Sequence, residues 1–98
     1  LNPGAPFDYD GQRLTYPDIK LVYWAGGSPF HHHQDLNRLR QAVANIETFV
    51  VHEIGWTATA RHADIVLPST MTLERNDIGA TQVDPLMVAM KQAAEPYG

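Results

Sequence analysis

Three short polar segments in this sequence each follow an apolar run, and they contain residue types that can hold a nucleotide. These segments are Gly26-Gly27-Ser28, His52-Glu53 and Pro68-Ser69-Thr70. Paired glycines let backbone N–H groups approach a phosphate or a ribose closely, and the Ser28 side chain adds a hydroxyl. The Glu53 carboxylate can accept hydrogen bonds from two ribose hydroxyls, as an acid does in dinucleotide folds. Gly-Gly-Ser-Pro is nevertheless not the pattern Gly-x-Gly-x-x-Gly, and taken alone such glycines more often form a plain turn.

Other polar side chains do not complete a recognisable catalytic group. His52, Glu53, Arg61 and His62 could polarise a substrate, but no nucleophile stands at a recognisable spacing from them. The chain has no cysteine, which excludes disulfides, thiolate zinc sites and cysteine nucleophiles. Its serines do not lie in Gly-x-Ser-x-Gly. The residues therefore do not indicate a hydrolase, and we assign no catalytic residue.

The run His31-His32-His33 invites interpretation as a metal site, because imidazole is a common metal ligand. Adjacent residues on a strand point to opposite faces, and no cysteine or carboxylate follows at a usual zinc-site spacing. We expect a structural role or a place at the edge of a cofactor, and we assign no metal ligand. Arg61 and His62 have the alternative of a solvated helix end, and Arg75 becomes a binding residue only if an anion is its partner.

Strands and helices that alternate along the chain must position these polar segments. The apolar and β-branched runs predict three buried strands, and the amphipathic spacing after Asp35, a plausible N-cap, predicts a helix between the first two. The expected order is strand 19–25, helix 34–44, strand 48–52, short helix 57–63 and strand 65–67. Such alternation favours parallel strands joined by right-handed crossovers. We predict an α/β fold: a small three-layer, mostly parallel sheet with flanking helices, Rossmann-like and part of a larger domain.

The remaining residues give weaker patterns. Residues 1–18 are rich in proline, glycine and polar side chains and are expected to be irregular, which leaves residues 19–98 as one α/β cofactor-binding subdomain. Residues 69–85 are expected to form a loop, and residues 86–93 fit either a fourth strand or a short helix.

Length and charge limit the classes of function. The 98 residues, 44% of them hydrophobic, suffice for one small domain. With 7 basic against 11 acidic residues, the formal net charge of -4 makes nucleic acid an unlikely partner. The apolar runs are strand-sized, which predicts no membrane insertion. The first residues look like a cut inside a longer chain, so a targeting signal would lie outside this segment and these residues indicate no cellular location.

Three ordered blocks carry a resemblance to a known family. Residues 23–35 read Tyr-Trp-Ala-Gly-Gly-Ser-Pro-Phe-His-His-His-Gln-Asp, and residues 51–68 contain Thr-Ala-Thr-Ala-Arg-His-Ala-Asp. The third block, residues 73–78, reads Leu-Glu-Arg-Asn-Asp-Ile. Together they resemble segments of the molybdopterin-dependent dimethyl sulfoxide, trimethylamine N-oxide and biotin sulfoxide reductases. The resemblance extends over most of residues 19–90.

The resemblance implies a cofactor and a set of binding residues. In this family the cofactor is molybdenum held by two molybdopterin guanine dinucleotides, and the domain that this segment resembles contacts one of them. Gly26, Gly27 and Ser28 would then lie against the nucleotide, and His52 and Glu53 would contact its ribose or guanine. Thr57 and Thr59 would face its phosphates, while Arg75 and Asp77 would close over the same ligand. One departure is Ser28, since the family loop usually reads Gly-Gly-Asn-Pro.

The resemblance also implies a parent protein several times longer. The serine that ligates molybdenum in these reductases has no match here, nor has the substrate funnel. We expect a fragment of an S-oxide or N-oxide reductase whose partners are the cofactor and the remaining domains of the parent enzyme. On its own the fragment is expected to be inactive, and to be marginally stable or to self-associate. One alternative is a stand-alone nucleotide-binding or interaction module without catalysis. A further alternative is a generic domain that binds NAD or a flavin.

Overall fold

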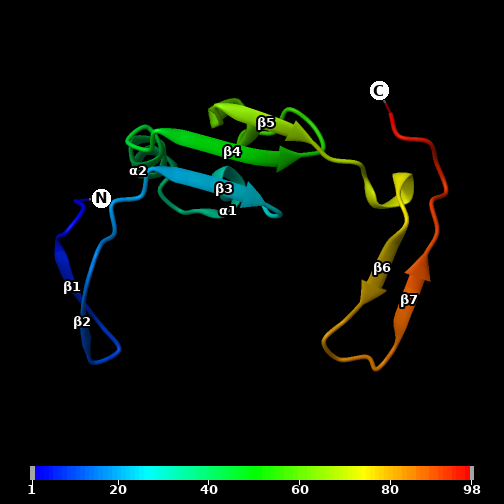
Figure 1. The fold of residues 1–98 in the computed structure, drawn as a ribbon, viewed down its shortest axis with the longest axis horizontal. Coiled ribbons are helices and arrows are strands. Elements are labelled where there is room, and N and C mark those ends of the chain that lie inside the picture. Colours follow the sequence, from blue (N-terminus) through cyan, green and yellow to red (C-terminus); the bar gives the residue numbers. More distant parts are fainter. Residues whose placement is uncertain (1, 98) are drawn as a thin grey trace. The chain divides into compact units, whose positions relative to one another are not determined.

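A computed structural model describes residues 2–97 of the chain. The chain divides into two compact units, residues 1–67 and residues 68–98. Figure 1 shows the elements of both. Our expectation of one subdomain over residues 19–98 differs from this division, which falls at the end of the last strand of the parallel sheet.

A three-stranded sheet forms the centre of the first unit. Its strands are β3 (Leu21–Ala25), β4 (Thr48–Glu53) and β5 (Ile65–Pro68), in the order β3-β4-β5. Strand β3 pairs with β4 in parallel, with Ala25 opposite His52, and the three arrows point the same way in Figure 1. All three predicted strands are therefore present, in a parallel sheet.

The connections carry the helices of this unit. Helices α1 (Pro29–His32) and α2 (Leu36–Val43) lie between β3 and β4, and the 3-10 turn η1 (Ala60–His62) precedes β5. The Asp35 side chain caps α2 by accepting a hydrogen bond from the Arg38 N–H at 3.0 Å, which confirms the predicted N-cap. The expected helix 57–63 is shorter, because Ala63 is already extended. Helix α1 was not predicted.

Within residues 2–67, one face of the sheet is better covered than the other, which is called the open face below. Phe49 and Val51 of β4 are almost fully buried, whereas Leu21 and Tyr23 of β3 are each 57% exposed. Because right-handed crossovers between strands that follow one another in order lie on the same side, both connections cover the same face. The mixed α/β fold with a parallel sheet is therefore confirmed, and the expectation of three fully buried strands is wrong for residues 2–67. The three-layer, Rossmann-like arrangement stays a prediction.

Asp64 ties β4 to the start of β5. The Asp64 Oδ2 atom accepts a hydrogen bond from the Phe49 N–H at 2.8 Å, and the Asp64 N–H donates to the Phe49 carbonyl at 2.9 Å. At the same, amino-terminal end of the sheet, the exposed Lys20 side chain contacts both Asp18 and Glu47. The two Asp64 bonds therefore hold the start of β5 against β4.

An N-terminal hairpin precedes the sheet. Strands β1 (Pro6–Tyr9) and β2 (Gln12–Thr15) pair antiparallel around Asp10 and Gly11. Both turn residues have positive φ angles, 47° and 72°, as a two-residue hairpin turn requires. The expectation that residues 1–18 are irregular is thus wrong for this stretch, and the Asp-Gly pair was the signal that could have revealed it.

The second unit contains another hairpin. The 3-10 turn η2 (Thr72–Glu74) leads into β6 (Asp77–Ala80), which pairs antiparallel with β7 (Met87–Met90). The expected loop 69–85 is therefore wrong at β6, and of the two alternatives for residues 86–93 the structure has the strand. After β7, the N–H groups of Ala93 and Ala94 donate to the Leu73 carbonyl. These bonds connect the segment after β7 to η2.

Candidate functional site

The carboxyl ends of β3 and β4 bring two of the predicted binding segments together. Because Ala25 and His52 are opposite each other in parallel strands, Gly26-Gly27 and Glu53 follow at the same edge of the sheet. The sequence predicts that the glycine loop and Glu53 lie at the same edge of the sheet, and the structure confirms this prediction.

The glycine loop adopts a conformation that favours glycine. Gly26 and Gly27 have φ angles of 82° and 67°, and a side chain added at either position would meet open space. The Trp24 indole donates from Nε1 to the Gly26 carbonyl at 2.7 Å. Within residues 2–97, the Gly27 N–H makes no hydrogen bond. The loop therefore presents an available amide donor on an unobstructed side.

Glu53 lies on the covered face and is half-buried. Its Oε1 atom accepts a hydrogen bond from the Thr57 hydroxyl at 2.9 Å, and the same hydroxyl accepts one from the Ala60 N–H at 3.1 Å. Thr57 thus orients the carboxylate against the start of η1. A carboxylate has two oxygens and about four acceptor sites, so Glu53 keeps capacity to accept from a ligand.

His52 points to the opposite face of the sheet. Successive side chains of a strand alternate, and the His52 Nε2 atom contacts the Tyr23 hydroxyl on the open face. The two rings are tilted by 58°, with centroids 5.3 Å apart. The structure therefore places His52 and Glu53 at one sheet edge but on different faces.

Ser28 and Thr59 are joined to each other. Their hydroxyl oxygens lie 2.7 Å apart, and Thr59 is 0% exposed. In the described residues the Thr59 hydroxyl is therefore buried against Ser28, and its expected role facing the phosphates of a ligand stays a prediction. No local pattern indicates the pair, since the two residues are 31 positions apart.

His62 lies beneath the same segment. Its ring stacks on Phe30 with centroids 4.0 Å apart, and its Nδ1 atom lies 2.7 Å from the Ala58 carbonyl. A carbonyl can only accept, so Nδ1 is the donor. Phe30 itself is almost fully buried. The alternative of a solvated helix end therefore does not describe His62, which packs from η1 against Phe30 of α1.

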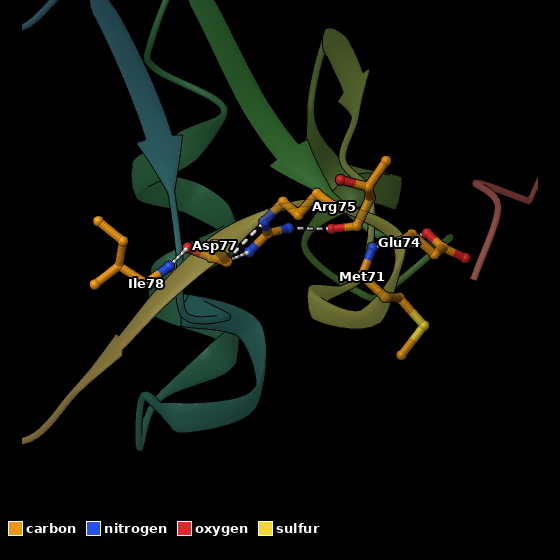
Figure 2. A network of polar contacts seen from close by, with 6 residues as sticks. Met71, Glu74, Arg75, Asp77 and Ile78 are labelled. Carbon is orange, nitrogen blue, oxygen red and sulfur yellow. Dashed lines mark hydrogen bonds and ion pairs between the residues drawn. The ribbon is translucent and has the colours of Figure 1, made fainter. Parts of the chain in front are cut away.

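Arg75 and Asp77 belong to the second unit, where they bind each other (Figure 2). The Arg75 Nε and Nη2 atoms both lie 2.8 Å from Asp77 Oδ2, and Nη1 donates to the Thr70 carbonyl. The Ile78 N–H donates to Asp77 Oδ1 at 2.8 Å. This bond and the Arg75 guanidinium hold the pKa of Asp77 below its usual value. Three of the five Arg75 N–H donors are engaged, which leaves two for an anion.

Residues 2–97 contain no group of three His, Cys, Asp or Glu side chains placed to hold a metal ion. A cleft of about 600 Å³ lies between α2 and the ends of the N-terminal hairpin, and its lining includes Tyr16, Arg38 and Asn45. None of the predicted site residues lines this cleft. Across the described range, no helix has the length and apolar character needed to cross a bilayer.

Comparison with known proteins decides the family. A model of the family described as molybdopterin oxidoreductase matches residues 9–98. The chain belongs to the molybdopterin oxidoreductase family. This family implies a molybdenum–pterin cofactor, and the chemistry of the available donors, an amide N–H and a carboxylate beside an open loop, fits the anionic and hydroxyl groups of such a ligand.

Individual relatives agree with this assignment. The chain is 53% identical over 98 residues to a biotin sulfoxide reductase of Cereibacter sphaeroides, a match that covers 100% of this chain and 13% of that protein. It is 54% identical to a dimethyl sulfoxide/trimethylamine N-oxide reductase of the same organism, over 98% of this chain and 12% of the relative. A trimethylamine-N-oxide reductase of Haemophilus influenzae is 50% identical, again over 98% and 12%.

The chain therefore spans only about an eighth of the length of the relatives it matches. A fragment of a molybdopterin oxidoreductase accounts for this coverage, and the alternative of a stand-alone module is not favoured. The remaining seven-eighths of such relatives implies further domains around a segment of this kind.

Proposed function

We propose that this chain forms part of the surface that binds one guanine dinucleotide of a molybdenum bis(molybdopterin guanine dinucleotide) cofactor, in an enzyme that reduces S-oxides or N-oxides. The observation that carries the proposal is the common edge of β3 and β4, where the open Gly26-Gly27 loop lies beside Glu53 in a chain of this family. The names of the relatives supply the substrate class.

Two groups of the first unit bind different parts of the ligand. The Gly27 N–H donates to an anionic oxygen, and the Glu53 carboxylate accepts from ribose hydroxyls or from a guanine edge. Ser28 and Thr57 hold these two groups in place. His52 approaches the same edge from the open face of the sheet.

Arg75 adds positive charge for the phosphates. Its two remaining N–H donors are oriented by the bonds to Asp77 and to the Thr70 carbonyl. A guanidinium fixed in this way loses less side-chain entropy when it binds an anion than a free one does. When bound, the molybdenum centre supplies the electron-transfer chemistry, and this chain supplies binding and orientation.

We also propose that other parts of the complete enzyme cover the open face of the sheet. The open face of the sheet exposes Leu21 and Tyr23, and a second helical layer from the rest of the enzyme would cover them. The complete domain would then be Rossmann-like, with helices on both faces of a parallel sheet.

Glu53→Gln in the complete enzyme tests the proposal. We expect the molybdenum and guanine content per polypeptide to fall at least tenfold in this variant, because it loses hydrogen bonds to a charged group. Reduction of dimethyl sulfoxide, trimethylamine N-oxide and biotin sulfoxide by reduced methyl viologen should fall in parallel. Glu95→Gln is the matched control, since Glu95 is exposed and lies far along the chain in the second unit.

Two results would contradict the proposal. One is a full complement of cofactor in the Glu53→Gln enzyme. The other is a preference of the unmodified protein for adenine over guanine nucleotides, which would favour the domain that binds NAD or a flavin.

A further inference from the structure

The hydroxyl pair Ser28–Thr59 joins two loops that are distant in the sequence. Thr59 precedes η1, and Ser28 directly follows the glycine loop. The oxygen atoms are 2.7 Å apart, with Thr59 fully buried and Ser28 half-buried. Among residues 2–97 this is the side-chain hydrogen bond that connects the loop after β3 to the segment 57–62. The pair therefore sets how the loop sits on η1.

The Ser28 hydroxyl is not used in the way its position suggests. Ser28 is the N-cap of α1, where a serine side chain ordinarily accepts a hydrogen bond from an N–H of the first helical turn. Here it makes no cap bond, and its partner is Thr59 instead. Since α1 has only four residues, the hydroxyl contributes to the placement of the loop and not to a long helix.

The glycine loop is consequently held on both sides. The Trp24 indole holds the Gly26 carbonyl, and the Ser28–Thr59 pair holds the other end. Phe30, stacked on His62, adds an apolar contact between the same two segments. Between these contacts lies Gly27, whose N–H makes no hydrogen bond within the described residues. A donor fixed before binding costs less entropy when the ligand arrives.

We infer that Thr59 is a positioning residue, which acts through Ser28 to fix the conformation of the Gly26-Gly27 loop before any ligand binds. That the fixed loop serves a pterin cofactor rests on the proposed function. Loop fixation itself can be measured in cofactor-free protein, so the two statements can fail separately.

Variants of the complete protein test the inference. Thr59→Val keeps the shape of the side chain and removes the hydroxyl, and Ser28→Ala removes its partner. Thr59→Ser keeps the bond and serves as the conservative rescue. Thr48→Val is the matched control, because Thr48 is a half-buried threonine at the opposite end of β4.

Hydrogen–deuterium exchange of peptides spanning residues 24–30 is the first measurement, made on cofactor-free protein. We expect Thr59→Val and Ser28→Ala each to speed exchange about three- to tenfold, the range expected for loss of one net hydrogen bond. The double variant should exchange no faster than either single variant, because both changes remove the same bond. Thr59→Ser and Thr48→Val should match the unmodified protein.

The second measurement is the guanine and molybdenum content of the loaded enzyme. Loss of guanine in Thr59→Val but not in Thr48→Val supports the inference together with the proposed function. Faster exchange with unchanged cofactor content in both Thr59→Val and Glu53→Gln supports loop positioning and overturns the proposed function. Unchanged exchange in a folded Thr59→Val protein, or additive effects in the double variant, overturns the inference.

Discussion

Several side chains that are predicted to contact a ligand bind one another within each of the two units. Thr57 orients Glu53, Thr59 holds Ser28, and Asp77 orients Arg75. Each of these partners was predicted to contact the cofactor directly. The structure shows that each of these polar groups is held by a neighbouring side chain, as a preorganised binding surface would require, and their contact with a cofactor stays a prediction.

At the residue scale, acid is expected to loosen the loop around Asp77. The pKa of this carboxyl is lowered in the folded state, first by the Ile78 N–H and then by Arg75. A lowered pKa stabilises the fold above the unfolded value of 3.8, and this contribution is lost as pH falls through the folded pKa. Hydrogen exchange of the Ile78 amide should therefore accelerate, relative to its intrinsic rate, as pH is lowered through this range.

Asp77→Asn is the control for this effect. An asparagine oxygen can still accept from Ile78, but it has no carboxyl group to protonate, so the acid-dependent acceleration should disappear. If exchange of the Ile78 amide accelerates equally in acid in the unmodified protein and in Asp77→Asn, the effect does not come from this carboxyl.

At the scale of elements, the parallel sheet depends on a side chain that stands in for a backbone partner. Asp64 accepts from the Phe49 N–H at 2.8 Å, just before β5 begins. We expect Asp64→Ala to raise exchange of the Phe49 amide about ten- to hundredfold, because a hydrogen bond to a charged group stabilises by about 1.5–3 kcal/mol. Asp18→Ala, at an exposed aspartate, should leave this amide unchanged.

The three strands and helix α2 could be predicted because their signals are local. A β-branched run, an amphipathic spacing and an N-cap at Asp35 are each contained within a few residues. The hairpin β6–β7 escaped prediction because Asp77–Ala80 has little β-branched character, and Gly79 fits there by lying against Met90. Pairing across the hairpin, and not local propensity, makes β6 a strand.

At the scale of the whole molecule, the isolated chain is predicted to be inactive. It carries residues that we propose for binding, but none that we can assign to catalysis. Purified alone, it should show no reduction of trimethylamine N-oxide by reduced methyl viologen, whereas we expect the complete enzyme to reduce it. Measurable turnover by the purified 98-residue chain would refute this prediction.

The isolated chain is also expected to self-associate. The open sheet face exposes Leu21 and Tyr23, each by 57%, and Trp56 is 72% exposed. Exposed apolar faces of this kind drive association. Sedimentation velocity should show a mass that rises with concentration, and Leu21→Thr with Tyr23→Thr should reduce the rise. A monomer at all concentrations would show that the open face does not drive association.

The sequence by itself determined the family, the parallel strands and most of the residues at the sheet edge. Glycines, β-branched runs and an ordered set of blocks can be recognised in a sequence when no contacts are known. Only the tertiary structure decided which of these side chains face one another and which face of the sheet each occupies. His52 and Glu53 diverge because strand neighbours alternate between faces, and Thr59 is buried because a turn far along the chain folds back onto Ser28. Such contacts depend on packing between distant segments, which no local pattern contains.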